Sequence, residues 1–391
     1  MIQGHSNLSF DNTEVAFKSK SNAALRKASL LFKSFDYPIT LRLGPTLAKL
    51  TVAVGLKSII KSTIFEQFCG GETILECNET INKLAQSGIG TILDYSVEGA
   101  ESDTAFNHTA QEILATIERA AGNSSIPFSV FKITGIVESR LLESVSQEKQ
   151  LDFTDQQKWD AGRQRFFNIC EAAANSDVRL FIDAEESWLQ EAIDRLAEEA
   201  MLRFNTAKPI IYNTLQMYRH DRLAYLDAQL ANTSHFLGFK LVRGAYMEKE
   251  RKRSLEMGYN DPIQVNKEAT DRDYDAAVAR CIENSHRVAI CIGTHNETSS
   301  LKGTALMQAQ QMPNQDTRVF FSQLLGMSDH ISFNLSHHHY NVAKYVPYGP
   351  VSAVIPYLTR RAQENSGMAG QMGRELGLIT NELQRRKKHK K

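Results

Sequence analysis

The chain has 391 residues, of which 42% are hydrophobic and 23% are charged, and its 45 basic and 45 acidic residues give a formal net charge of zero. This composition is typical of a globular protein in water, and the balanced charge argues against nucleic acid as a partner. The first twenty residues are polar and lack an apolar h-region, which argues against a secretory signal. No run of about eighteen apolar residues predicts a membrane span, and the five cysteines lack metal-ligand spacing. We therefore expect a cytoplasmic protein with reduced thiols.

The first region, residues 1–87, has a helical pattern interrupted by a loop at Gly70 and Gly71. Its Leu47–Phe68 segment is amphipathic, with lysines spaced along an otherwise apolar stretch. A segment of this kind usually packs against its own protein, and contact with a membrane surface is the alternative. We predict an N-terminal helical region over residues 1–87.

From residue 88 onward, short apolar runs alternate with longer, charged stretches that favour helix. The runs are bounded by Gly, Pro, Asn or Asp, as buried parallel strands are. The predicted strands are Gly90–Ser96, Phe128–Thr134, Val178–Ile182, Pro209–Asn213, Gly238–Val242, Arg287–Gly293, Arg318–Ser322 and Asn341–Tyr345. The predicted helices between them include Leu189–Phe204, Arg222–Ala231 and Asn266–Asn284.

This α/β alternation predicts a (β/α)8 TIM-like barrel over residues 88–377, followed by a basic C-terminal tail over residues 378–391. A doubly wound sheet is the competing architecture. It normally carries a glycine-rich first turn, and no G-x-G-x-x-G sequence is present. The barrel is therefore favoured.

In a barrel of this kind, catalytic residues lie at the carboxyl ends of the strands. Polar residues follow or end most of the predicted strands, so we expect them to converge on one face. They are Lys132, Asp183, Asn213, Lys240 to Tyr246, Thr294 to Asn296, Gln323 and Tyr345.

Several of these residues also have a purely structural interpretation. Lys132 could extend to the rim of the barrel, although a lysine in an apolar strand is costly to bury without an anion. Asp183 could cap the following helix, and Gly244 could serve a turn. Thr294 to Asn296 could be a satisfied polar strand end, and the run His337 to His339 is expected to be a loop feature rather than a metal site.

The segment after the last predicted strand carries two adjacent arginines, Arg360 and Arg361. If it is helical, Tyr357 lies on the face of both arginines, and Glu364 lies within reach of either. A guanidinium pair beside tyrosine rings suits a small anion with an apolar body, because arginine binds a carboxylate through two parallel hydrogen bonds. A solvated Arg/Glu face above packed tyrosines is the alternative.

The pattern Tyr-Leu-x-Arg-Arg-x-x-Glu-Asn at residues 357–365 resembles the signature of the proline dehydrogenase family. Other stretches agree with that family in the same order, and the resemblance covers roughly residues 88–377. These stretches are Phe131–Thr134, Phe181–Glu186, Lys240–Tyr246, Gly293–Asn296 and Gln323–Met327. The resemblance implies a monofunctional, FAD-dependent enzyme that oxidises L-proline.

The resemblance also implies roles for individual residues. Arg360, Arg361 and Lys132 would bind the substrate carboxylate, and Asp183 would orient this cationic cluster. Leu324, Tyr345 and Tyr357 would enclose the ring of proline. The residues that would contact FAD, which is held non-covalently, are Asn213, Gln216, Lys240, Val242, Gly244, Ala245, Tyr246, Thr294, His295, Asn296, Gln323 and Glu364. Lys240 replaces an arginine of some members, and Asn213 replaces a glutamine.

The implied reaction passes a hydride from C5 of proline to N5 of the flavin and gives Δ1-pyrroline-5-carboxylate. The family commonly passes the electrons on to a membrane quinone. The basic run Arg385 to Lys391 could attract anionic lipid and bring the protein to the inner face of the membrane, or it could be a solubilising disordered tail. No metal is expected.

Three other functions remain open at this stage. A 4-hydroxyproline dehydrogenase would share the site, but Tyr345 is expected to crowd C4 of the substrate ring. A barrel lyase or hydrolase without flavin could use Lys132, Asp183 and His295. A non-catalytic protein with the same arginine pair would bind small carboxylates without oxidising them.

Overall fold

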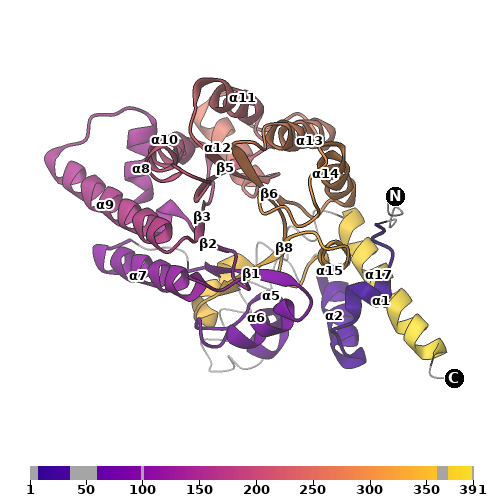
Figure 1. The fold of residues 1–391 in the computed structure, drawn as a ribbon. Helices are drawn as coiled ribbons and strands as arrows, with labels where there is room; N and C mark the ends of the chain where they lie inside the picture. Colours follow the sequence, from indigo (N-terminus) through magenta and orange to yellow (C-terminus); the bar gives the residue numbers. More distant parts are fainter. Residues whose placement is uncertain (1–7, 36–59, 98–100, 359–368, 390–391) are drawn as a thin grey trace. The chain divides into compact units, whose positions relative to one another are not determined.

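The structure, a computed structural model, describes residues 8–35, 60–97, 101–358 and 369–389. Within these residues, parallel strands β1 to β8 follow one another in chain order around a closed barrel (Figure 1). The strands are β1 Ile89–Tyr95, β2 Phe128–Phe131, β3 Arg179–Ile182, β4 Ile211–Gln216, β5 Leu237–Val242, β6 Val288–Gly293, β7 Val319–Leu324 and β8 Val342–Tyr348. The predicted (β/α)8 barrel is confirmed.

Strands β2 and β4 end at other residues than predicted. β2 ends at Phe131 because the chain turns into a short 3-10 helix, η2 Ile133–Gly135. β4 continues beyond Asn213 to Gln216, and all of its residues are buried. An extension of three residues changes which side chains of β4 lie at the strand end, because side chains alternate between the two faces of a strand.

The chain divides into two compact units, Gly99–Ser322 and the combination of Met1–Glu98 with Gln323–Lys391. In the first unit, Figure 1 shows the helices outside the strands. These helices are α7 Asp103–Ala120, α8 Ser139–Ser146, α9 Phe153–Asn175, α10 Ser187–Phe204, α11 Arg222–Asn232, α12 Met247–Met257, α13 Lys267–Glu283 and α14 Glu297–Ala309. The predicted helices correspond to α10, α11 and α13 and are confirmed.

Aromatic rings fill the amino-terminal end of the strands in this unit. Phe128 stacks on Phe181 with ring centroids 4.2 Å apart, and Tyr212 meets Phe181 edge-on at 5.5 Å. The guanidinium of Arg179 lies 5.4 Å from the ring centroid of Phe128 and 5.2 Å from that of Phe320. This packing agrees with the rule that barrel enzymes carry their sites at the carboxyl ends of the strands.

The second unit combines the N-terminal helices with β1, β8 and the last helix. Its described helices are α1 Thr13–Phe17, α2 Asn22–Phe35, the π-helix η1 Lys61–Phe65, α5 Glu66–Phe68, α6 Asn78–Ala85, α15 Asp329–His337, helical residues 351–358 and α17 Ala369–Lys388. One apolar core cluster joins Leu25, Phe32, Phe65, Tyr357 and Leu378. The N-terminal region is therefore not a separate domain, because it shares its core with the C-terminal helix.

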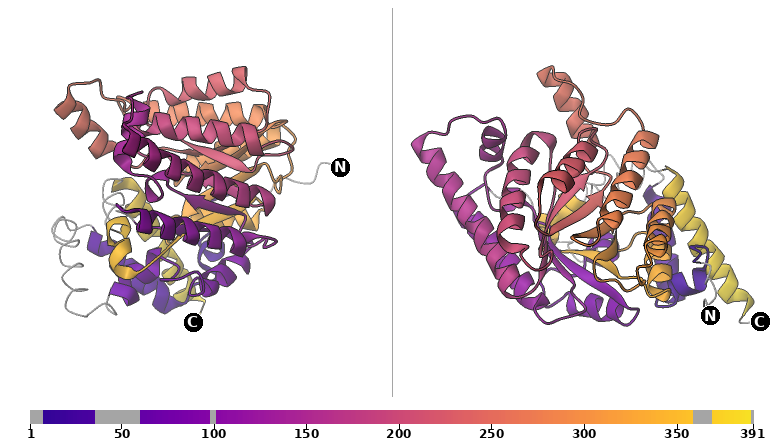
Figure 2. Two further views of the ribbon diagram at one scale, coloured as in Figure 1. Left: turned by 90° about the vertical axis from the view of Figure 1, so that its left-hand side faces the viewer. Right: turned by 45° about the horizontal axis from the view of Figure 1, so that its top comes forward.

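The predicted separate tail over residues 378–391 is wrong as far as residue 388. Helix α17, coloured yellow in Figure 2, runs to Lys388. Its residues Leu378, Ile379 and Glu382 are buried. Arg386 donates to Glu382 at 2.6 Å and to the backbone oxygens of Phe17 and Lys20, both at 2.7 Å. Part of the basic run thus fastens α17 to the N-terminal helices.

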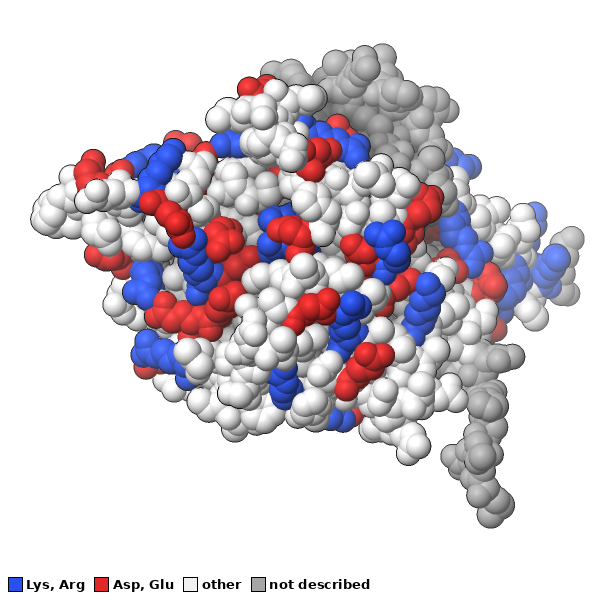
Figure 3. All heavy atoms as spheres, turned by 90° about the horizontal axis from the view of Figure 1, so that it is seen from above, with Lys and Arg blue, Asp and Glu red and all other residues white. Residues whose placement is uncertain are grey.

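The amphipathic Leu47–Phe68 segment lies partly outside the described residues. Its last part forms η1 and α5, where Phe65 and Phe68 are buried in the core cluster. No described helix is both long and apolar enough to cross a membrane. On the face drawn in Figure 3, basic and acidic side chains are interspersed, in keeping with the net charge of zero.

We predict that Arg386→Met lowers the free energy of unfolding by about 2 kcal/mol, because it removes hydrogen bonds to a buried carboxylate and to two carbonyls. Urea denaturation of the purified protein measures the change. Lys387→Met is the matched control, since Lys387 is exposed and next in the chain. Equal unfolding midpoints for the two variants would show that Arg386 does not fasten α17.

Candidate active site

An ion pair between a buried lysine and a partly buried aspartate links two strands of the first unit. Lys240 on β5 donates to Asp183, which directly follows β3, in a short contact. The Lys240 ammonium also lies 5.3 Å from the ring centroid of Phe181. Since β4 separates β3 from β5, the pair lies across the inner face of the sheet. Asp183 therefore holds the Lys240 ammonium in place, whereas its predicted role of orienting Lys132, Arg360 and Arg361 stays a prediction.

A second carboxyl group in the same loop, Glu185, is not among the predicted site residues. It is buried, and it accepts hydrogen bonds from the Thr134 amide at 2.9 Å and the Thr134 hydroxyl at 2.5 Å. Burial raises the pKa of Glu185 to about 7, although the Thr134 hydrogen bonds and the charge of Lys132 act to lower it. The structure thus brings Lys132, Thr134 and Glu185 together.

Gln216, at the end of β4, ties two loops of the site. Its side-chain amide donates to the Glu185 carbonyl at 2.7 Å, and its side-chain oxygen accepts from the Ala245 amide at 3.0 Å. Gln216 is buried, so both bonds are shielded from water. The loop after β3 and the loop after β5 are therefore held at a fixed spacing.

The loop after β5 carries Gly244, whose φ of +139° favours glycine. A Cβ atom there would lie 2.5 Å from the ring of Tyr218, so the ring explains the glycine without a ligand. The Tyr246 amide donates to the Tyr218 hydroxyl at 3.3 Å, and the Val242 carbonyl accepts from Met217 at 2.8 Å. Gly244 and Ala245 are nevertheless exposed residues.

Arg243 organises the neighbouring end of β6. Its guanidinium donates to Asp271 at 2.7 Å, to the Thr294 hydroxyl at 2.6 Å and to the Ser299 hydroxyl at 2.9 Å. Asn296 caps α14 by accepting from the Ser299 amide at 3.0 Å. The Thr294 and Asn296 side chains thus serve the strand end and the cap, whereas the role of the half-buried His295 stays a prediction.

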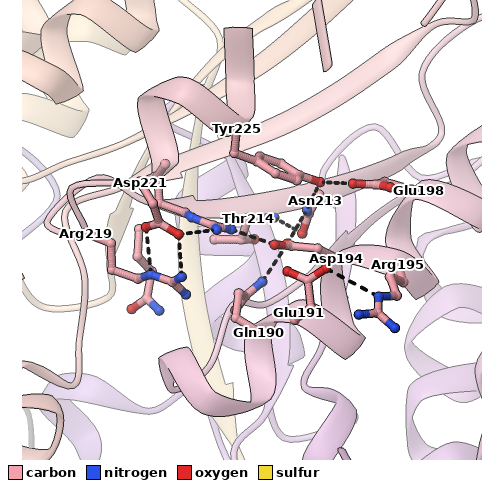
Figure 4. Close-up of polar contacts among 12 residues, drawn as sticks. Gln190, Glu191, Asp194, Arg195, Glu198, Asn213, Thr214, Arg219, Asp221 and Tyr225 are labelled. Atoms are coloured by element: carbon pink, nitrogen blue, oxygen red, sulfur yellow. Dashed lines mark hydrogen bonds and ion pairs between the residues drawn. The ribbon is translucent and has the colours of Figure 1, made fainter. Parts of the chain in front are cut away.

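The assignment of Asn213 to the cofactor is wrong. Its side-chain amide donates to Asp194 of α10 at 2.9 Å and to the Tyr225 hydroxyl of α11 at 3.2 Å (Figure 4). Its side-chain oxygen accepts from the Thr214 amide at 2.8 Å. Because the strand runs on to Gln216, Asn213 is a mid-strand residue that points outward at the helices, and Gln216 ends the strand.

In the second unit, the predicted ring-enclosing residues lie close to one another. Leu324 ends β7 and packs against the core cluster that contains Tyr357. The Leu325 amide donates to the carbonyl of Tyr345 at 2.8 Å, and the side-chain oxygen of Gln323 accepts from Ser332 at 2.7 Å. Arg360, Arg361 and Glu364 lie outside the described residues, so their roles stay predictions.

The donors around the ends of β5 and β6 are compatible with FAD. Lys240, Arg243 and the exposed backbone at Gly244 present cationic or N–H groups, which suit the phosphates and the carbonyl-rich edge of a flavin. On the inner face of β4, the buried Thr214 hydroxyl has no hydrogen-bond partner among the described residues. Within the same residues, no group of three His, Cys, Asp or Glu side chains could hold a metal ion.

Comparison with known sequences identifies the family. The family model described as "Proline dehydrogenase" matches residues 77–374. The chain belongs to the proline dehydrogenase family. This confirms the resemblance drawn from the motifs and the expectation of an enzyme of that family.

Two curated relatives illustrate the range of the proline dehydrogenase family. "Proline dehydrogenase 1, mitochondrial" of Dictyostelium discoideum is 34% identical, and the match covers 86% of this chain and 67% of the relative. "Hydroxyproline dehydrogenase" of Xenopus laevis is 29% identical, with coverage of 98% and 91%.

A solved structure supports the fold. Proline utilization A from Bdellovibrio bacteriovorus, inactivated by N-propargylglycine, has a TM-score of 0.71 and 16% identity to this chain. The match covers 95% of this chain but only 41% of that protein. At this identity the likeness concerns the fold alone.

The opposite faces of β4 generate a paired prediction. Gln216→Ala should weaken FAD binding by about tenfold. The variant loses the hydrogen bonds that join the loops after β3 and β5, and the expected loss of binding free energy is near that of one buried hydrogen bond. Asn213→Ala should leave FAD binding unchanged and lower the free energy of unfolding by about 1–3 kcal/mol, because Asp194 and Tyr225 lose a buried partner. Flavin fluorescence titration and urea denaturation measure the two effects, and a reversed pattern would restore Asn213 to the cofactor site.

Proposed function

We propose that this chain oxidises L-proline to Δ1-pyrroline-5-carboxylate with FAD as its cofactor. The observation that carries the proposal is the family match over residues 77–374, which includes all of the barrel strands together with Arg360 and Arg361. The buried pair of Asp183 and Lys240 supports it, since it lies where barrel enzymes carry their reactive groups.

Substrate recognition in this proposal begins with the carboxylate. Lys132 and the two arginines would bind it, and Arg361 would contribute paired, charge-assisted hydrogen bonds. Glu185, whose pKa burial raises to about 7, lies close enough to Lys132 for the charge of Lys132 to act on it. Leu324, Tyr345 and Tyr357 would enclose the apolar ring.

The cationic side chains also affect the amine of the substrate. A positive charge nearby disfavours a second positive charge, so this site would lower the pKa of the bound ammonium. Loss of that proton leaves a neutral amine, whose lone pair assists departure of a hydride from C5. The tied loops after β3 and β5 would keep the reacting groups aligned, which is the main contribution a rigid site makes to rate.

The residues that would hold FAD are those at the ends of β4, β5 and β6, with Gln216, Lys240 and the backbone at Gly244 and Ala245 foremost. Bound FAD would supply the hydride acceptor that protein side chains lack. Lys240, held in place by Asp183, would place positive charge near the cofactor.

The terminal electron acceptor in this proposal is a quinone, on the strength of the family resemblance. We favour proline over 4-hydroxyproline because the bulky Tyr345 is expected to crowd a substituent at C4. The Xenopus relative named for hydroxyproline makes this the closest competing substrate.

An anaerobic visible spectrum tests the proposal. The purified protein should show the bands of oxidised flavin, and L-proline should bleach them, whereas trans-4-hydroxyproline at the same concentration should leave them largely intact. A colourless protein would instead support a lyase or hydrolase. A flavin that persists when proline binds would support a non-catalytic binding protein, and comparable bleaching by both amino acids would overturn the role of Tyr345.

Arg361→Met tests whether the two arginines and Lys132 bind the substrate carboxylate. It should raise the KM for proline by at least about tenfold, because charge-assisted hydrogen bonds are worth about 1.5–3 kcal/mol each. Arg272→Met is the control, since 70% of that side chain is exposed. Equal KM values in the two variants would show that Arg361 does not bind the substrate carboxylate.

A further inference from the structure

Residues 324–329 form the turn between β7 and α15, and a buried lysine on β8 forms hydrogen bonds to this turn. Lys344 is fully buried, and its ammonium donates to the Leu324 carbonyl at 3.2 Å, to the Met327 carbonyl at 2.5 Å and to Asp329 at 2.9 Å. An ammonium has three donors, so these contacts use all of them. Lys344 thereby joins the first residue of the turn to its last residue.

The backbone of this turn needs such support. Gly326 has a φ of +75° and Ser328 a φ of +51°, both in the left-handed region that costs energy for a residue with a side chain. A Cβ atom at Gly326 would lie 2.1 Å from the Gln67 carbonyl, and the Gln67 side chain donates to the Gly326 carbonyl at 2.9 Å. The turn is held in one conformation by its surroundings.

Both ends of the chain complete the cluster around the turn. Lys20, from the segment between α1 and α2, pairs with Asp329 at 2.6 Å, and Glu375 of α17 accepts from the Ser328 amide at 3.1 Å. Burial raises the pKa of Asp329, but the charges of Lys20 and Lys344 outweigh it and hold this pKa below its usual range. Without Lys20, Lys344 alone would face two carboxyl groups.

We propose that Lys20 is a positioning residue for the substrate pocket: through Asp329 and Lys344 it fixes the turn that sets the place of Leu324 against the substrate ring. This inference rests on the proposed function, which assigns Leu324 to that ring. It gives the N-terminal helices a role in fitting the substrate. A purely stabilising ion pair is the alternative.

Calorimetric titration with two carboxylates separates these possibilities. Cyclopentanecarboxylate offers a ring and a carboxylate, whereas acetate offers the carboxylate alone. In the FAD-loaded protein, Lys20→Met should raise the Kd of cyclopentanecarboxylate roughly five- to tenfold, a range typical of residues that act through a network, and should leave that of acetate unchanged. Lys20→Arg, which keeps the charge, should restore most of the ring affinity.

Lys18→Met is the control, since Lys18 is exposed and lies two residues away. If Lys20→Met does not fold, Lys20→Gln is titrated in its place. Unchanged Kd values for both ligands, or a parallel loss for both, would overturn the positioning role. These outcomes are distinct from failure of the proposed function, in which the wild-type flavin would not be reduced by proline at all.

Discussion

A charge buried in the barrel wall must be paired, and a buried lysine paired with an aspartate occurs in each of the two units of the chain. Removing an ion from water costs several kcal/mol, and only a well-placed partner offsets that cost. In one unit Lys240 meets Asp183, and in the other Lys344 meets Asp329. Each pair joins a strand to the loop that follows a different strand, so satisfying the charge also fixes the loop.

Hydrogen bonds hold further loops of the site in place. Gln216 joins the loop after β3 to the loop after β5, and Thr134 holds the Glu185 carboxyl beside Lys132. A barrel enzyme keeps its strands constant and varies its loops, so the precision of its site depends on such ties.

The sequence predicts the barrel well because its strands are buried on both faces and appear as short apolar runs. It predicts strand ends less well, and the error at Asn213 shows why. The apolar run stops at Asn213, but buried polar residues carry β4 on to Gln216. The extension makes Asn213 a mid-strand residue rather than the last one, and only its partners on α10 and α11 reveal that its side chain points outward.

Partners far apart in the chain are the other part that sequence reasoning misses. Lys20 and Asp329 are separated by most of the chain, and nothing in the local pattern of either residue indicates the pair. Gly244 shows a milder form of the problem. A Cβ atom at this position would meet the Tyr218 ring, a contact that the local sequence around Gly244 does not indicate.

A double-mutant cycle on Asp183→Asn and Lys240→Met, measured by urea denaturation of the flavin-free protein, tests the central claim most directly. Each single variant removes one member of the ion pair and should lower the free energy of unfolding by about 3–5 kcal/mol. The double variant should cost clearly less than the sum, with a coupling of about 2 kcal/mol or more. Effects that add to within about 0.5 kcal/mol would contradict the account, because the two charges would then not depend on each other.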